Sequence, residues 1–501
     1  MRVALISTPT RTYAPNYVPP LGIMYLAAHL RNVGHTVTII DVARTRQSNK
    51  QTLKELEAFN PDLIAISAII TAYHFVWELV HDIKKSHQDA SIVVGGHITL
   101  DNVDMLINDV RADYVIQGYG ELKLAALVDY LSGKITIKEV PGLSYKRNLE
   151  LITNPGDPFY KKLDDAPIPA YDLIDMEYYI TVSDHYPKLE TYLKKNNKPA
   201  PPPRSFVVIG ARGCTDKCSF CVHEFDRKGF RIHSVVYLVK NIRILYEQYG
   251  VRIFFMGEDL FLFNPRYAEE FVEAMNKNFP DAYFQFSTRA DYVTLDILHT
   301  MKYSNCYAIV YGFESGNNQI LNILGKRIDR KVNIRAYKLI SVHGITPACS
   351  FMVGTMGETK ETIEDTIDAI REAGVLEGAV FFTTPYPGSR IYRWCIENNY
   401  ITDRHAYLEY ISNRDAVRLS INLTQYPDYI VKMMKTLVEN ALEDNRIKIN
   451  PEYKVPIIRR IFHRRIVPFI YNLYFSSRRT HGETTEYELN KNGTVKLAGE
   501  T

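Results

Sequence analysis

Short apolar runs alternate with longer amphipathic segments over the first 135 residues. The apolar runs predict strands, and the spacing of apolar positions between them predicts helices. The predicted strands span residues 2–7, 36–41, 63–67, 91–96 and 113–118, and two of the predicted helices span 21–34 and 72–87. Strands that are apolar throughout are typical of a parallel sheet covered on both faces. Residues 1–135 are therefore predicted to form a doubly wound α/β domain of the flavodoxin or Rossmann type.

The same alternation returns between residues 205 and 400. The predicted strands span residues 205–210, 252–257, 283–288, 307–312, 346–354 and 378–384, and helical patterns such as 264–279 and 360–374 separate them. Six strand–helix units predict a partial barrel related to the TIM barrel, a (βα)6 arrangement. Its chemistry is expected at the C-terminal ends of the strands.

Two regions lack this rhythm. Residues 136–204 are rich in Pro and Asp and are interpreted as a linker between the domains. Residues 401–501 are predicted to be mainly helical, and they contain a run of arginines and aromatic residues at 456–479. That run fits either peripheral contact with a membrane or a helix packed on the barrel with its arginines in solvent, and the second reading is favoured.

Composition narrows the class of protein. A chain of 501 residues is long enough for two or three domains, and a net charge of +3 gives no reason to expect a nucleic-acid partner. The N-terminus lacks the pattern of a signal peptide, and no run of 18 apolar residues predicts a spanning helix. With only six cysteines, the chain is expected to be cytoplasmic, with peripheral contact at the inner membrane face as the alternative.

Three of the six cysteines lie in the stretch "GCTDKCSFCVH", which directly follows the first strand of the second series. Cys214, Cys218 and Cys221 could hold three irons of a four-iron, four-sulfur cluster and leave the fourth iron open. A structural zinc site needs four protein ligands, and His223 could be the fourth. The cysteines alone favour a cluster and leave zinc open.

The spacing Cys-x-x-x-Cys-x-aromatic-Cys, with Phe220 before the third cysteine, resembles the signature of the radical S-adenosylmethionine (SAM) superfamily. Later segments agree with that family in order: they are "MGEDLF" (256–261), "STRAD" (287–291), "YGFESG" (311–316), "FMVGTMGET" (351–359) and "TPYPGSRIY" (384–392). The resemblance implies that the three cysteines bind a [4Fe-4S] cluster and that SAM chelates its open iron.

The same resemblance implies roles for residues near SAM. Phe220 would lie near the adenine, and Glu258 or Asp259 would bind the methionine ammonium. Ser287 and Arg289 would lie near the carboxylate, with a structural ion pair to Asp291 as the alternative for Arg289. Glu314 and Ser315 would face the ribose hydroxyls.

The N-terminal domain resembles the cobalamin-binding domain fused ahead of one radical SAM subclass, through "VPPLGIMYLAAHLRNVGHTVTIIDV" (18–42), "SIVVGGHITLD" (91–101) and "DYVIQGYGE" (113–121). The cobalamin contacts that this implies are Ser67, Gly95, Gly96, His97, Gly118 and Glu121. A satisfied loop histidine is the alternative for His97.

The sequence departs from the related pattern in three places. Ala43 and Arg46 stand where domains with a histidine lower ligand carry His and Gly, and Tyr119 stands where an acidic residue is usual. No imidazole is offered at that position, so cobalamin would bind without a histidine lower ligand, or the domain has lost cobalamin.

The resemblance implies a cobalamin-dependent radical SAM enzyme that forms a 5′-deoxyadenosyl radical. The larger expectation is methylation of an unactivated carbon, through methylcobalamin, in a small-molecule or lipid-like substrate. The alternatives are a cyclase or ring-rearranging enzyme that transfers no methyl group, and a non-catalytic zinc or iron–sulfur regulatory protein. A low-potential electron donor of the flavodoxin or ferredoxin type is the expected partner.

Overall fold

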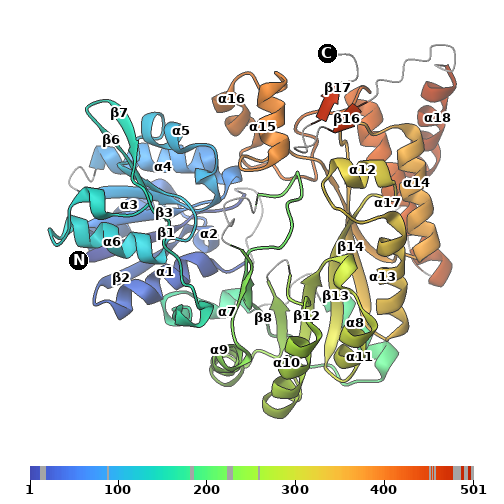
Figure 1. The fold of residues 1–501 in the computed structure, drawn as a ribbon, viewed down its shortest axis with the longest axis horizontal. Helices are drawn as coiled ribbons and strands as arrows, with labels where there is room; N and C mark the ends of the chain where they lie inside the picture. The colour runs from blue at the N-terminus through green and yellow to red at the C-terminus, as the bar shows by residue number, and fades with distance from the viewer. Residues whose placement is uncertain are drawn as a thin grey trace.

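The computed structural model describes residues 1–11, 18–86, 90–180, 186–222, 229–257, 260–450, 453, 455, 459–477, 487–489 and 495–497. Figure 1 shows an N-terminal α/β domain, in blue and teal, beside a barrel-like sheet in green and yellow. The helices α15 and α16, in orange, lie between the two, and α17 and α18 lie on the side of the barrel away from the N-terminal domain.

The N-terminal sheet has the order β2-β1-β3-β4-β5-β6-β7. Its strands are β1 Arg2–Ser7, β2 Thr36–Asp41, β3 Leu63–Ser67, β4 Ser91–Gly95, β5 Tyr114–Ile116, β6 Leu143–Arg147 and β7 Glu150–Thr153. The first five are parallel, and their order 2-1-3-4-5 is that of flavodoxin. The helices are α1 Leu21–Asn32, α2 Val42–Thr45, α3 Asn49–Phe59, α4 Tyr73–Ser86, α5 Val103–Asn108 and α6 Glu121–Leu131.

The five predicted strands are parallel, as expected, and the sheet continues beyond them. Strands β6 and β7 form an antiparallel hairpin that extends the sheet beyond β5, inside the region interpreted as a linker. A parallel pair needs a long crossover, but a hairpin closes with a tight turn, so it adds to the sheet without a helix. Two helices, α7 Met176–Tyr179 and α8 Tyr186–Asn196, also lie within that region.

The second sheet confirms the six predicted barrel strands, in the order β15-β14-β13-β12-β11-β8 with every pair parallel. They are β8 Ser205–Val208, β11 Ile253–Met256, β12 Tyr283–Thr288, β13 Cys306–Glu314, β14 Thr346–Val353 and β15 Glu377–Phe382. The covering helices are α9 Val235–Gln248, α10 Pro265–Asn278, α11 Leu295–Lys302, α12 Asn318–Ile323, α13 Arg330–Val342 and α14 Lys360–Ala373. A short antiparallel pair, β9 Ala211–Arg212 and β10 Arg231–Ile232, flanks the cysteine segment.

The C-terminal region is mainly helical, as predicted. Helix α15 Arg390–Glu397 precedes it. The described elements of this region are α16 Arg404–Ile411, α17 Asp428–Ile449, a π-helix Arg459–Ile466, α18 Val467–Ser477 and a small pair, β16 Tyr487–Leu489 and β17 Val495–Leu497. Helix α17 packs on α14 and β15.

The two domains are held together by packing and by ion pairs. One buried apolar cluster includes Ile66 of β3 and Tyr392 of α15. Arg404 of α16 binds the carboxylate of Asp104 with both terminal nitrogens, at 2.9 and 3.0 Å. Because apolar burial is continuous across this contact, the N-terminal domain has a defined place over the barrel.

Candidate functional site

The cysteine segment is a loop that begins where β9 ends, and its backbone is fixed at one point. The Ser219 N–H donates to the carbonyl of Leu324 at 2.9 Å, and the Ser219 hydroxyl donates to the carbonyl of Ile323 at 2.9 Å. The carbonyl of Ser219 accepts from the N–H of Ile391 at 3.0 Å. These bonds fix the loop between the end of α12 and the start of α15.

The three loop thiols are partly exposed, and none is in a disulfide. Among the described residues, no three His, Cys, Asp or Glu side chains converge as the ligands of one metal ion do. A four-iron cluster does not require such convergence, because each thiolate binds a different iron. The loop therefore fits a cluster held from one side. His223 lies outside the described residues.

Two buried cations lie beside Cys218. Arg289, 6% exposed, places Nη1 3.9 Å from the Cys218 Sγ, and its Nε lies 3.0 Å from carboxylates of both Asp216 and Asp291. Burial raises the pKa of the Cys218 thiol, whereas the charges of Lys326 and Arg289 oppose that rise. Metal ligation requires the thiolate, so the two cations favour the form that binds iron.

Arg289 thus lies beside Cys218 and makes the structural ion pair with Asp291 that was the alternative, while its contact with SAM stays a prediction. Lys326 was not singled out from the sequence. Its Nζ lies 3.3 Å from the carboxylate of Glu314, and both side chains are about as buried as those of the core, at 6% and 7% exposure. A lone lysine after a helix gives no local signal of such a pair.

Glu314 ends β13 in an unusual backbone conformation. Its φ is +62°, in the left-handed region that disfavours side chains, and its carboxylate also accepts from the Ser350 hydroxyl at 3.4 Å. The carboxylate folds back over Gly312, where an added Cβ would overlap it. A strained residue held by an ion pair at the end of a barrel strand is typical of a binding site.

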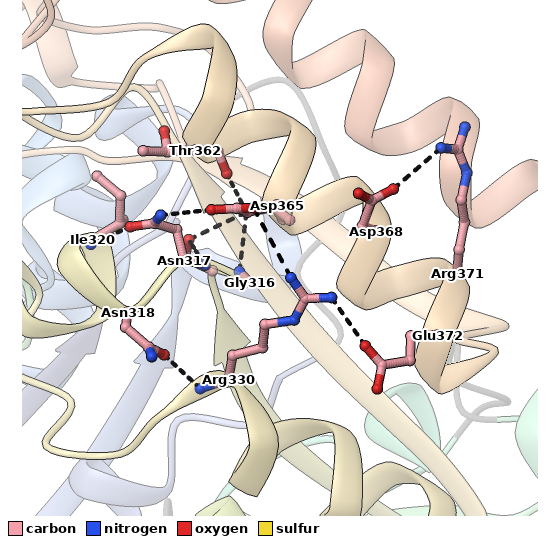
Figure 2. Close-up of polar contacts among 12 residues, drawn as sticks. Gly316, Asn317, Asn318, Ile320, Arg330, Thr362, Asp365, Asp368, Arg371 and Glu372 are labelled. Carbon is pink, nitrogen blue, oxygen red and sulfur yellow. Dashed lines mark hydrogen bonds and ion pairs between the residues drawn. The ribbon is translucent and has the colours of Figure 1, made fainter.

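The loop after β13 is anchored on α14, as Figure 2 shows. Asn317 donates to Asp365 at 2.7 Å, and the Gly316 N–H donates to the Thr366 hydroxyl at 3.0 Å. Arg330 pairs with Glu372 of α14 at 2.9 Å. Gly316 is required because a Cβ there would lie 2.4 Å from the carbonyl of Asp365. Ser315 is 1% exposed, and its hydroxyl lies 3.2 Å from the hydroxyl of Thr366.

The structure shows fewer contacts for the other residues predicted to lie near SAM. Phe220 is partly buried and packs against the buried apolar side chains that the two domains share. Ser287 lies in β12 and its carbonyl accepts from the N–H of Phe261 at 3.1 Å. Glu258 and Asp259 lie outside the described residues.

A cavity of about 370 Å³ opens at the C-terminal ends of the N-terminal strands. Its wall contains all six residues predicted to contact cobalamin, namely Ser67, Gly95, Gly96, His97, Gly118 and Glu121. Helix α1 contributes Gly22 and Tyr25, and the barrel domain contributes Ile209 and Arg212. The cavity therefore lies at the domain junction, where open α/β sheets bind their ligands.

The wall of this cavity fits a bulky cofactor. A Cβ added at Gly22 would meet no atom within 4 Å, and one at Gly95 would meet only the carbonyl of Ile116 at 3.5 Å. Apolar side chains such as Leu5, Ile116 and Leu124 form much of the remaining wall. Bare backbone at the mouth of a sheet lets a large group approach closely. The residues present therefore fit the cobalamin that the sequence predicts.

Filling the cavity is expected to exclude cobalamin. Gly95→Leu should reduce the corrinoid bound per chain by about tenfold or more, because a side chain of that size would occupy the space beside Ile116. Gly95→Ala is the matched control and should retain corrinoid, since its one methyl group makes an ordinary contact. Corrinoid absorbance and iron content report the two cofactors separately. Equal corrinoid binding by both variants would contradict this assignment of the cavity.

Ala43, which stands where some related domains carry the histidine lower ligand of cobalamin, packs inside the protein. Ala43 is fully buried in α2, and the Asp41 carboxylate accepts from the Tyr179 hydroxyl at 2.7 Å. Arg46 has a φ of +54°, a left-handed conformation that explains why glycine suits this position in related domains. Burial raises the pKa of the Asp41 carboxyl, and the hydrogen bond from Tyr179 opposes that rise. No imidazole is offered at Ala43.

A buried ion pair joins the cavity to the cysteine segment. Arg212 lies 2.8 Å from Glu121, and their side chains are 9% and 6% exposed. The rings of Tyr25 and Tyr119 lie 4.9 and 5.0 Å from the Arg212 guanidinium carbon. Tyr119, which stands where related domains usually carry an acidic residue, thus packs on the Arg212 cation and contributes no charge of its own. Arg212 was missed because an arginine before Gly-Cys has no distinctive spacing.

Comparisons with known proteins agree with both parts of this site. A family model described as the B12 binding domain matches residues 8–128, and one described as the radical SAM superfamily matches residues 208–370. The chain is 29% identical to "Uncharacterized methyltransferase PH0819" of Pyrococcus horikoshii, over 80% of this chain and 84% of that protein. It is 25% identical to the anaerobic magnesium-protoporphyrin IX monomethyl ester cyclase of Rubrivivax gelatinosus, over 75% of this chain and 66% of that protein.

Solved structures share the fold. The cobalamin-dependent SAM radical enzyme OxsB, with aqua-cobalamin bound, superposes with a TM-score of 0.62 at 20% identity, covering 85% of this chain and 58% of OxsB. The radical SAM methyltransferase TsrM of Kitasatospora setae, with cobalamin and a [4Fe-4S] cluster bound, gives 0.61 at 18% identity, covering 79% and 75%. With family models for a B12-binding domain and a radical SAM domain that together match more than half of it, the chain belongs to the cobalamin-dependent radical SAM enzymes, which use a [4Fe-4S] cluster, SAM and cobalamin.

Proposed function

We propose that the protein methylates an unactivated carbon of a small-molecule or lipid-like substrate. The observation that carries the proposal is the position of Arg212, which lines the cavity two residues before Cys214. Two residues of extended chain span at most about 7 Å, so the cluster loop starts at the wall of the cavity. Both cofactors would therefore face one reaction space, as a transfer between them and a shared substrate requires.

When bound, the three cofactors supply one-electron reduction, hydrogen abstraction and methyl transfer, and the protein supplies their positions. Cys214, Cys218 and Cys221 hold the cluster, and Arg289 and Lys326 bring positive charge to Cys218. Glu314, fixed by Lys326, presents a carboxylate at the end of β13. The N-terminal domain and α15–α16 share one buried apolar cluster beside the cysteine loop, and such a cover would limit the access of water to a reaction there.

The remaining predicted contacts complete the proposed site. Phe220 borders the adenine, and Ser287 and Arg289 bind near the methionine carboxylate. Glu258 or Asp259 binds the ammonium, and Glu314 and Ser315 lie near the ribose. An electron donor of the flavodoxin or ferredoxin type reduces the cluster.

The proposal is tested by following the methyl group. We expect the reconstituted holoenzyme to move a deuterated methyl group from labelled SAM to its corrinoid, and to form 5′-deoxyadenosine in the presence of a low-potential reductant. Mass spectrometry of extracted metabolites and lipids incubated with the enzyme should then show one added labelled methyl group. A non-methylating reaction is the second candidate, because one relative is a cyclase. 5′-Deoxyadenosine formation with an unlabelled, altered substrate would favour it over methylation.

A further inference from the structure

The last described helices carry a contiguous set of exposed apolar side chains, here called the C-terminal apolar face. Exposure is 68% at Phe469, 58% at Leu473 and 52% at Ile461. The complete set is Ile461, Phe462, Ile466, Phe469, Ile470 and Leu473. Side chains of this size are normally buried, and an exposed group of them marks a contact surface.

The opposite face of the same helices is fixed to the protein. Val467 and Tyr471 of α18 are 4% and 3% exposed, and Tyr471 belongs to the barrel core. Asn440 of α17 donates to the carbonyl of His463 at 2.8 Å. Arg464 pairs with Asp444 and lies 3.6 Å from Glu443. Packing on α17 therefore holds α18 on the side of the barrel away from the N-terminal domain (Figure 1), and the C-terminal apolar face stays exposed.

The helices that carry this face have charged side chains of one sign only. Residues 459–477 contain four arginines and a histidine but no aspartate or glutamate. Arg465 is exposed. Arg459 is 56% exposed, although its Nη1 lies 3.8 Å from the carboxylate of Glu443 on α17, and Asp444 lies against Arg464. An exposed apolar surface with a cationic border is complementary to a surface that is apolar beneath a layer of negative charge.

The length and composition of the segment set how it could meet a bilayer. The π-helix of 8 residues runs directly into α18 of 11 residues, and the four arginines of this continuous helix all lie in its first part. No helix among the described residues is long and apolar enough to cross a membrane. The composition of the segment, with arginines in one part and apolar side chains along its length, favours contact with a membrane surface.

We propose that the C-terminal apolar face docks this enzyme on an anionic phospholipid surface. The apolar side chains enter the boundary between headgroups and acyl chains, and Arg459 and Arg465 contact lipid phosphates. A symmetric dimer through the same face is disfavoured, because it would bring the arginines of one copy toward those of the other. The inference does not depend on which reaction the barrel carries out.

Vesicle flotation with the holoenzyme tests the proposal. We expect binding to vesicles of phosphatidylglycerol and phosphatidylcholine in equal parts, little binding to phosphatidylcholine alone, and weakening by salt. F469S/L473S should weaken partition by about a hundredfold, since two large apolar side chains no longer enter the lipid. R459Q/R465Q should weaken it by about tenfold or more. V342S is the matched control, because Val342 on α13 is 75% exposed and should not matter.

Two further readouts separate the possible occupants of the face. F469W should shift its fluorescence emission to shorter wavelength when anionic vesicles are added and should retain iron and corrinoid. Absence of vesicle binding by the unsubstituted holoenzyme would overturn the proposal. A concentration-dependent dimer that F469S/L473S abolishes, without vesicle binding, would also overturn it in favour of a second copy. Unchanged iron and corrinoid contents show that either result leaves the proposed catalytic function untouched.

Discussion

Replacing Cys218 by alanine is expected to remove the iron–sulfur cluster. Iron should fall from about four per chain to below about one, because a cluster bound by three thiolates cannot keep its place with two. SAM cleavage should fall below detection, since SAM binds the open iron of that cluster. Anaerobic reconstitution followed by iron, sulfide and 5′-deoxyadenosine assays measures both losses.

A matched thiol shows whether the loss is specific. Cys306 lies fully buried in β13 and burial raises the pKa of its thiol, so it has no tendency to bind iron. Cys306→Ala should retain the cluster and lose only a small amount of packing. Corrinoid should be retained by both variants, because the cavity is lined mainly by the N-terminal domain. Zinc in place of iron in the unsubstituted protein would contradict the cluster assignment.

Breaking the buried pair between Arg212 and Glu121 is expected to cost about 3–5 kcal/mol of unfolding free energy. Arg212→Met leaves the carboxylate of Glu121, whose side chain is 6% exposed, without its partner. The domain junction should loosen, so bound corrinoid should fall as well. Urea unfolding followed by circular dichroism, with corrinoid absorbance on the same samples, measures both effects.

Two further variants serve as controls for the loss of stability in Arg212→Met. E121Q/R212M removes both charges and should recover much of the lost stability, because no unpaired charge then remains buried. Arg31→Met breaks an exposed pair with Asp172 and should cost at most about 1 kcal/mol. Equal losses for Arg212→Met and Arg31→Met would show that the buried pair has no special role at the junction.

The buried strands were the most predictable part of the fold. Strand β1 is exposed only at its first residue, and the apolar run at 2–7 shows this directly in sequence. The hairpin β6–β7 was missed because its strands are short and half polar: Lys146, Arg147 and Glu150 are all exposed. The edge of a sheet leaves weaker periodicity than its centre.

The candidate site divides in a similar way. Local spacing indicated the cysteine loop, and the resemblance to a cobalamin-binding domain indicated six residues that the structure places in the wall of the cavity. The sequence could not identify Arg212 or Lys326. The partner of Arg212 lies 91 residues earlier in the chain, and a single basic residue forms no periodic pattern. Likewise, the arginine-rich run predicted a helix but not which of its faces would pack on α17.

The sequence by itself determined the order of the strands and helices, and it supplied the predicted cluster ligands and the glycines that line the N-terminal cavity. These depend on neighbours along the chain, or on strand ends that a parallel sheet must bring to one edge. Only the tertiary structure decided that Arg212 ties the cavity to the cysteine loop, that Lys326 holds Glu314, and that an apolar face remains exposed at the C-terminus. Those features depend on which surfaces meet when the domains pack, and the local periodicity of the sequence does not predict which surfaces those are.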